Sequence, residues 1–266
     1  MFIAHERPLV EGRLLARYDR FIATIELGSG EVIEAHCVNP GRMEGMVVPG
    51  AKAWVSRAPE GTKRKLLYTL ELLFIGGHYI GANTVVPNRL GEALVRAGKI
   101  PGLKRFSSLR REVRYGTNSR VDLLLQCGAI EHLVEIKNCH LVYPDGGAYF
   151  PDSVSVRAAG HLEELSNEVR AGRKATVLFI IQRADGEFLR PSRLHDPAFA
   201  DAVQAAAKAG VRFKAAKVEP RPDGFHFIGL IPVDLKPDDT EPLRAYRDAL
   251  LPDSGWIRRG RKRALA

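Results

Sequence analysis

The sequence is poor in cysteine and contains no long apolar run. Its three cysteines, Cys37, Cys127 and Cys139, lie far apart and form no CxxC pair. This spacing argues against a disulfide framework or a structural zinc site, and it favours a reducing cytoplasm. No apolar stretch approaches the roughly 18 residues of a membrane-spanning helix, and the N-terminal segment lacks the uninterrupted apolar core of a secretory signal. We therefore expect a cytoplasmic protein with no membrane partner.

The composition is that of an ordinary soluble globular protein, with 45% hydrophobic and 27% charged residues. A formal net charge of +9 favours polyanionic partners. However, five of the cations lie in segment 258–263, which has no acidic residue, and removing them from +9 leaves +4. That segment is either a solvated, disordered end or an arm that contacts phosphate. Charge alone therefore permits nucleic acid as a partner without requiring it.

Short segments rich in β-branched, aromatic and aliphatic residues alternate with turn signals in the first part of the chain. The predicted strands are GRLLARY, RFIATIEL, EVIEAHCV, AKAWVSR and LLYTLELLFI. Glycine- and proline-containing turns such as Asn39-Pro40-Gly41 separate them. Several short strands at this spacing, without a convincing helix, favour a small barrel of the oligonucleotide-binding (OB) type. We predict this OB-like, nucleic-acid-binding barrel over residues 1–83.

The pattern changes near residue 84, where strands begin to alternate with helices. Asn88 is expected to cap a helix from about Arg89 to Ala97, which Gly98 ends. The predicted elements that follow are the strands RREVRYG, SRVDLLLQ and HLVEIKNC, a helix over 154–171, the buried strand ATVLFIIQ, a helix over about 197–209, and the strands VRFKAAKV and FHFIGLIPV. This order predicts an α/β domain with a mixed sheet over residues 84–250, followed by a basic C-terminal tail over 251–266.

Charged residues interrupt two adjacent aliphatic strands. Glu135 and Lys137 are two residues apart, so they project from one face of the sheet, and a hairpin would place Asp122 beside Glu135. Adjacent carboxylates repel each other unless a cation sits between them, and Mg²⁺ or Mn²⁺ suits such oxygen ligands. The Lys137 ammonium can orient a metal-bound water or stabilise a phosphorane. The pattern predicts a phosphodiester-cleaving site; the alternative is an exposed ion pair of Glu135 with Lys137.

Further polar residues surround the predicted site. Gln182 ends the buried strand, where it either faces a substrate or merely caps the strand in solvent. Arg157 and His161 are spaced i, i+4 and share a helix face, either to contact phosphate or as an ordinary exposed basic face. Glu92, on the preceding helix, is a candidate third carboxylate for the metal.

Several segments match a known family in the same order. They are RYDRFIA, EAHCVNPGRM, RKLLYTLEL, VPN, LRREVRYGTNSRVDLLL, VEIKN, FPDSVSVRAAGHLEEL and VLFIIQR. Over most of its length the chain resembles the sugar fermentation stimulation protein family. The resemblance implies an OB-type barrel, a PD-(D/E)xK nuclease-like α/β domain, and DNA binding with a proposed regulatory role in sugar metabolism. The nuclease motif then falls on Asp122, Glu135 and Lys137, and Gln182 is similar to a glutamine of some nuclease branches.

The resemblance also makes Arg42, in a barrel turn, a candidate contact to nucleic acid or to the second domain. Four arginines cluster around the Asp122 strand, namely Arg110, Arg111, Arg114 and Arg120. Because alternate residues of a strand point to opposite faces, not all four can reach one groove. Contacts to phosphate would give affinity and salt dependence without sequence choice.

Two functional hypotheses follow. The first is a Mg²⁺- or Mn²⁺-dependent deoxyribonuclease with Asp122 and Glu135 as ligands and Lys137 as the catalytic cation. The second is a non-catalytic, sequence-tolerant DNA-binding regulator linked to sugar (maltose) metabolism. The intact carboxylate pair favours the first and the family's description favours the second, whereas a sugar-metabolising enzyme has only the family name in its support. The sequence leaves open the preferred DNA structure, endo or exo cleavage, and the oligomeric state, including a homodimer.

Overall fold

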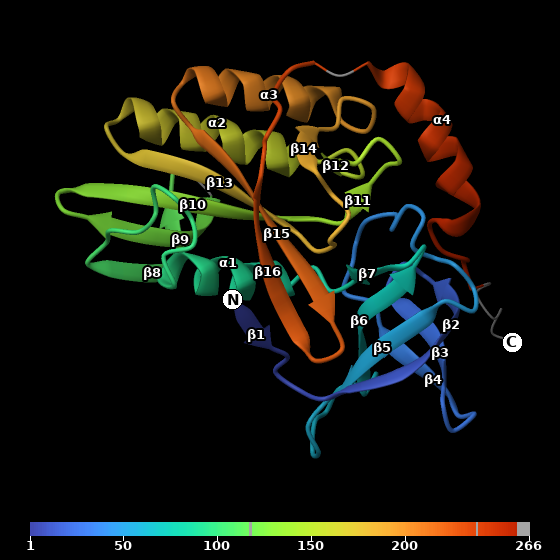
Figure 1. The fold of residues 1–266 in the computed structure, drawn as a ribbon. Coiled ribbons are helices and arrows are strands. Elements are labelled where there is room, and N and C mark those ends of the chain that lie inside the picture. Colours follow the sequence, from blue (N-terminus) through green and yellow to red (C-terminus); the bar gives the residue numbers. More distant parts are fainter. Residues whose placement is uncertain (117–118, 238, 260–266) are drawn as a thin grey trace, which may run out of the picture.

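The computed structural model describes residues 1–116, 119–237 and 239–259, which form a β-barrel and an α/β domain (Figure 1). The barrel sheet consists of β2 (Leu9–Tyr18), β3 (Ile22–Leu27), β4 (Val32–His36), β5 (Lys52–Arg57), β6 (Tyr68–Ile75) and β7 (His78–Gly81). Its strand order is β4-β3-β2-β5-β6-β7, and β4 also pairs with β6, which closes the barrel. Inward-facing aliphatic residues of these strands form one core. The predicted OB-type barrel is confirmed.

The α/β domain is built on a seven-stranded mixed sheet. Its strands are β1 (Phe2–Ala4), β8 (Ser108–Tyr115), β9 (Ser119–Cys127), β10 (Ile130–Cys139), β13 (Lys174–Ile181), β15 (Arg212–Arg221) and β16 (Gly224–Ile231). The order is β1-β16-β15-β13-β10-β9-β8, with parallel pairing of β13 to β10 and to β15 and antiparallel pairing elsewhere. Strand β1 precedes the barrel in sequence, yet it is an edge strand of this sheet. The predicted mixed-sheet α/β fold is confirmed.

Helices cover both faces of this sheet (Figure 1). The remaining elements are α1 (Val86–Arg96), α2 (Val156–Arg170), α3 (Pro197–Lys208), α4 (Thr240–Leu250), the 3₁₀ helix η1 (Leu251–Asp253), and a small sheet of β11 (Leu141–Val142), β12 (Gly147–Phe150) and β14 (Phe188–Pro191). Apolar residues of α2 and α3 pack into one core with the sheet, and those of α1 pack into another. No helix among the described residues is both long and apolar enough to cross a membrane.

Helix α1 begins earlier than its sequence predicts. The residue before its first turn is Val85, whose side chain forms no cap, and Pro87 lies in the first turn, where proline is favoured. The prediction that Asn88 caps the helix is therefore wrong. Asn88 lies inside α1, and its amide is used by a residue of the sheet instead.

After α4 the chain returns to the barrel (Figure 1). The Gly255 N–H donates to the Arg42 carbonyl at 2.6 Å, and the Ile257 N–H donates to the Arg17 carbonyl at 2.9 Å. The segment from 251 to 259, which the sequence assigns to a basic tail, thus lies against β2 and the turn after β4. Three of the tail cations, at 261–263, lie outside the described residues.

A buried arginine organises this junction. The Arg17 side chain is 2% exposed, and its guanidinium stands 5.6 Å from the Trp256 ring centroid. It donates hydrogen bonds to five backbone carbonyls, those of Arg20, Asn39, Gly41, Arg42 and Gly255. Arg17 therefore joins β2, the turn after β4 and the C-terminal segment at one point.

Candidate functional site

The proposed carboxylate site lies where β9 and β10 separate. Their antiparallel ladder ends at Leu123 and Val134, one residue before Asp122 and Glu135 would pair. Asp122 Oδ2 instead accepts the Ile136 N–H at 2.6 Å, and Asp122 Oδ1 accepts a hydrogen bond from Asn88 Nδ2 at 2.7 Å. Asp122 is therefore held between α1 and β10, beside the residues of the ExK triplet.

Glu135 is 4% exposed and belongs to a chain of polar contacts. Its Oε1 lies 2.7 Å from Lys137 Nζ and 2.8 Å from His161 Nδ1. Arg157 Nε donates to His161 Nε2 at 3.3 Å, so this nitrogen acts as the acceptor and the ring proton lies on Nδ1, toward Glu135. The structure thus brings Asp122, Glu135 and Lys137 together, although their catalytic roles stay predictions.

These residues fit a hard divalent cation. Glu135 Oε2 is buried and has no hydrogen-bond partner among the described residues. Burial, followed by the negative charge of Glu135, raises the pKa of Asp122 to about 6. For Glu135, burial acts to raise the pKa, but His161 and Lys137 outweigh it and the pKa is lowered. An unpartnered carboxylate oxygen near a second crowded carboxylate is a place where a cation removes repulsion.

The site offers few protein ligands. No group of three or more His, Cys, Asp or Glu side chains within the described residues is arranged to hold a metal ion. Mg²⁺ commonly keeps several waters and uses only one or two carboxylates. Asp122 and Glu135 would therefore be the protein ligands of such an ion, with water supplying the others.

Asp122 leads to a predicted pH dependence of stability in the absence of divalent cations. Its pKa is about 6 in the folded protein, against an ordinary value of 3.8. The folded state binds a proton at the Asp122 carboxylate more tightly than the unfolded state does. Loss of that proton as the pH rises from about 4 to about 6 therefore lowers the free energy of unfolding. The difference in free energy of unfolding between Asp122→Asn and wild type should therefore shift by about 2 kcal/mol in favour of the variant from pH 4 to pH 7. Urea denaturation in chelator at both pH values measures this, and a pH-independent difference would contradict the raised pKa.

Glu92 lies apart from Asp122 and Glu135, whereas Gln182 lies at the end of the buried strand β13, as predicted. The Glu92 carboxylate pairs with Arg96 at 2.9 Å and with Arg111 at 3.3 Å, and the structure does not group it with the other two carboxylates. Gln182 is 1% exposed, so the alternative of a solvent-exposed strand cap is wrong. Its Nε2 donates to Asn138 Oδ1 at 2.8 Å and to the Asn83 carbonyl at 3.2 Å. Gln182 therefore links the end of β10 to the segment that leaves the barrel.

The predicted phosphate-contacting residues divide into exposed and buried members. Arg42, Arg110, Arg111, Arg120 and Arg157 are exposed. Arg110 pairs with Glu131 at 3.3 Å on the edge strand β8. His161, by contrast, is only 9% exposed, so it does not lie on an open basic face. Packing of α2 against the sheet turns its ring toward Glu135, where it orients a carboxylate instead.

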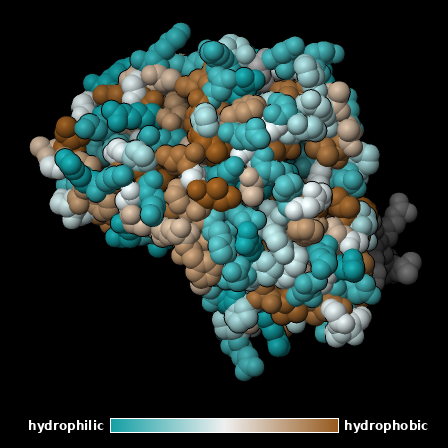
Figure 2. All heavy atoms as spheres, viewed as in Figure 1, coloured by the Kyte–Doolittle hydropathy of each residue, from teal (hydrophilic) through white to brown (hydrophobic). Residues whose placement is uncertain are grey.

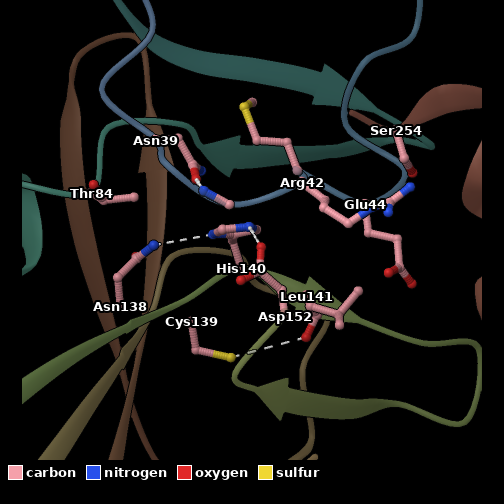
Figure 3. A network of polar contacts seen from close by, with 12 residues as sticks. Asn39, Arg42, Glu44, Thr84, Asn138, Cys139, His140, Leu141, Asp152 and Ser254 are labelled. Carbon is pink, nitrogen blue, oxygen red and sulfur yellow. Dashed lines mark hydrogen bonds and ion pairs between the residues drawn. The ribbon is translucent and has the colours of Figure 1, made fainter. Parts of the chain in front are cut away.

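A second polar cluster joins the barrel to the α/β domain, and Figure 3 shows part of it, with Glu44 from the barrel turn and Asn138 and His140 from the α/β domain. Glu44, from the barrel turn, accepts a hydrogen bond from Tyr143 Oη at 2.6 Å and lies 3.0 Å from His195 Nε2. Nearby, Asn138 Nδ2 lies 3.0 Å from His140 Nδ1. No sequence pattern indicates these partners, because they come from distant segments. The cluster places the barrel turn close to the end of β10, the strand that carries Glu135 and Lys137.

A cleft of about 360 Å³ lies between the barrel and the α/β domain. Its lining comes from the N-terminal segment, the barrel, α1 and β8, and includes Arg7, Glu71, Asn88, Arg111 and Glu112. Asn88 lines this cleft and also donates a hydrogen bond to Asp122, but Asp122, Glu135 and Lys137 are not among the lining residues. Hydrophilic residues predominate on the face of the molecule shown in Figure 2, with hydrophobic residues scattered among them.

Both domains match models of known protein families. Residues 15–82 match the family model described as the SfsA N-terminal OB domain, and residues 85–224 match the sugar fermentation stimulation protein RE domain. A sugar fermentation stimulation protein homolog of Maricaulis maris is 48% identical over 215 residues, covering 80% of this chain and 91% of the relative. A homolog of Geotalea uraniireducens is 43% identical over 86% of this chain and 98% of its own length. The solved structure of Pyrococcus furiosus SfsA in complex with Ca²⁺ superposes with a TM-score of 0.79 at 26% identity, covering 88% of this chain and 99% of that one.

Proposed function

The chain belongs to the sugar fermentation stimulation protein family, and we propose that it is a DNA-binding protein whose α/β domain hydrolyses phosphodiester bonds. The observation that carries this proposal is the proximity of Asp122 to Glu135, whose buried Oε2 has no partner among the described residues and whose Oε1 contacts the Lys137 ammonium. Asp122 and Glu135 would hold Mg²⁺ or Mn²⁺. When bound, such an ion activates water and neutralises charge on the phosphate.

The other residues position and complement this pair. Asn88 and the Ile136 N–H hold both oxygens of the Asp122 carboxylate in place. His161 fixes the orientation of Glu135. Lys137 uses one of its three N–H donors on Glu135 and is 14% exposed, so the other donors remain for a phosphate oxygen in the transition state.

Separate observations support a divalent cation and DNA as the ligands of this protein. The Pyrococcus furiosus relative is described as a complex with Ca²⁺, which like Mg²⁺ takes oxygen ligands. OB folds bind oligonucleotides, and the exposed arginines offer contacts to phosphate. Such contacts give affinity with little sequence preference. The proposed partner is therefore DNA, bound largely without regard to sequence.

A cleavage assay tests the proposal. Labelled single-stranded, duplex and branched DNA are incubated with the protein and Mg²⁺ or Mn²⁺, and then with an excess of chelator. Cleavage that requires the cation and stops with chelator is the expected result. Binding of every substrate without cleavage would contradict the nuclease and favour the second candidate, a sequence-tolerant DNA-binding regulator linked to sugar metabolism.

The C-terminal cations lead to a separate prediction about DNA affinity. Removal of residues 260–266 deletes the cations at 261–263 but retains Arg259, which pairs with Glu34 on the barrel. If the deleted residues bind phosphate, the slope of log affinity against log salt should fall by about 0.9 for each phosphate that is no longer neutralised. Fluorescence anisotropy across a salt series measures the slope. An unchanged slope would show that these cations do not contribute to binding.

A further inference from the structure

A pocket of about 470 Å³ lies at the end of the seven-stranded sheet where the parallel strands β10 and β13 begin. Its lining comes from the loop after α1, the β9–β10 turn and the first residues of these two strands, and it includes Lys104, Arg105, His132 and Lys174. The other end of β13 reaches the segment that leaves the barrel, so the pocket lies at the far end of the α/β domain from the barrel (Figure 1).

The strand register brings four polar side chains to one face of the sheet here. His132 of β10 pairs with Lys174 of β13, and Thr176 of β13 pairs with Arg212 of β15. Lys174 and Thr176 are two residues apart on one strand, so all four side chains project from the same face. Further along the strands this is the face that packs against α1. The polar end of the face is therefore set by the sheet itself.

A buried histidine belongs to this polar group. His132 is only 2% exposed although it lines the pocket. In the described part of the chain only its Nε2 has a hydrogen-bond partner, Thr176 Oγ1 at 2.8 Å. Burial, followed by the positive charges of Lys174 and Arg212, lowers the pKa of His132 to about 4. The ring is therefore neutral at neutral pH, and when Thr176 donates to Nε2 the ring proton lies on Nδ1, ready to be donated.

Cations without anionic partners stand around this histidine. Lys104, Arg105 and Lys174 line the pocket. A Cβ atom on Gly102, another lining residue, would stand 3.6 Å from Arg212 Nη1, so the Arg212 guanidinium lies beside the pocket. None of these four cations forms an ion pair with any residue that the structure describes.

The surrounding sequence offers these cations no counter-charge. Segments 98–107, 171–176 and 208–214 meet at this end of the sheet and contain no acidic residue. Glu131, beside the β9–β10 turn, pairs through Oε1 with Arg110 and through Oε2 with Arg173. No carboxylate of the described residues lines the pocket. A concave site with charge of one sign focuses the field and attracts counter-ions, so this pocket attracts anions.

We propose that this pocket binds a phosphate group, with Lys174, Arg212 and the loop cations Lys104 and Arg105 as its charged contacts and His132 as a donor from the buried side. Phosphate fits because its oxygens accept charge-assisted hydrogen bonds from several lysines and arginines at once. The phosphate belongs either to a free oxyanion or to the backbone of DNA, which present the same chemistry to the pocket.

The pocket is separate from the proposed carboxylate site. His132 and Glu135 are three residues apart on β10, so their side chains project from opposite faces of the sheet. Glu135 contacts His161 of α2, whereas the face that carries His132 packs against α1. Phosphate binding here therefore goes beyond the proposed function and does not depend on it.

Calorimetric titration of the full chain with pyrophosphate, free of divalent cations, tests the proposal. Lys174→Gln and Arg212→Gln each remove one exposed charge, and each should weaken pyrophosphate binding at least about tenfold. Lys208→Gln is the matched control, because Lys208 is an exposed cation at the end of α3, which packs on the opposite face of the sheet. It should bind pyrophosphate like wild type.

A cysteine reports where the ligand binds. Cys127 lines the pocket and is partly exposed, whereas Cys37 and Cys139 are buried. Pyrophosphate at about ten times its Kd should slow alkylation of Cys127 by iodoacetamide about tenfold, because only the unoccupied pocket admits the reagent. Unchanged alkylation at that concentration would place the bound pyrophosphate elsewhere and overturn the site.

The two sources of phosphate give different results. Pyrophosphate binding that Lys174→Gln and Arg212→Gln weaken and Lys208→Gln does not supports the site with a free oxyanion as its ligand. If pyrophosphate does not bind, weaker DNA binding by the two pocket variants than by Lys208→Gln, with protection of Cys127 by DNA, supports the site with backbone phosphate as its ligand. Equal behaviour of all three variants toward both ligands overturns it. None of these results requires cleavage, so the nuclease is tested separately.

Discussion

Asp122→Asn is expected to slow cation-dependent DNA cleavage by at least about a thousandfold. The substitution removes a negative ligand oxygen and leaves a side chain of the same shape. The remaining amide oxygen can still accept the Ile136 N–H, so the separation of β9 from β10 should persist. Single-turnover cleavage of labelled DNA at saturating Mg²⁺ measures the rate of the chemical step.

A matched control is available at the β15–β16 turn. Asp223 has an exposed side chain whose only described partners are local, so Asp223→Asn should cleave at the wild-type rate. Both variants should unfold at temperatures close to wild type at neutral pH, or higher in the case of Asp122→Asn. Full activity of Asp122→Asn would remove Asp122 from the site.

The second large effect is expected from Arg17→Ala, which should lower the free energy of unfolding by about 3–5 kcal/mol. The substitution leaves several carbonyls without their donor in a buried position, and each such acceptor costs about 1–3 kcal/mol unless water reaches it. It also removes the contact of the guanidinium with the Trp256 ring. Urea denaturation followed by circular dichroism measures the loss.

Arg13→Ala provides the comparison on the same strand. Among the described residues the Arg13 side chain makes one hydrogen bond, which is exposed and donated to the Gly50 carbonyl at 3.0 Å, so its replacement should change stability by no more than about 0.5 kcal/mol. If Arg17→Ala were no more destabilising than Arg13→Ala, Arg17 would not hold the junction together.

Local patterns were sufficient to predict the elements that carry the site. The period-2 alternation along the barrel strands indicates which residues face the core. An aliphatic strand interrupted by Asp122 indicates a functional carboxylate. The spacing of Glu135 and Lys137 places them on one face, and their contact at 2.7 Å agrees with that inference. These features depend on residues that are close in sequence, where geometry is nearly fixed.

The partners of these residues could not be predicted in the same way. Asn88 resembles a helix cap, but its amide reaches Asp122, which lies 34 positions later. His161 resembles part of an exposed basic face, because nothing in its own helix shows that the ring turns toward Glu135. Gln182 and Asn83 meet only because the two domains pack together. Each of these contacts depends on the relative placement of distant elements.

The two ends of the described chain cross over between the domains. Strand β1 comes before the barrel and completes the α/β sheet, whereas residues near Gly255 come after the α/β domain and attach to the barrel. A fragment that stops after β7 would keep β1 but lose its partner strand β16, and it would lack the carbonyl that Arg17 binds on Gly255. Each end of the described chain thus attaches to the domain that lies farther from it in sequence, so we expect the barrel and the α/β domain to melt together in one cooperative transition.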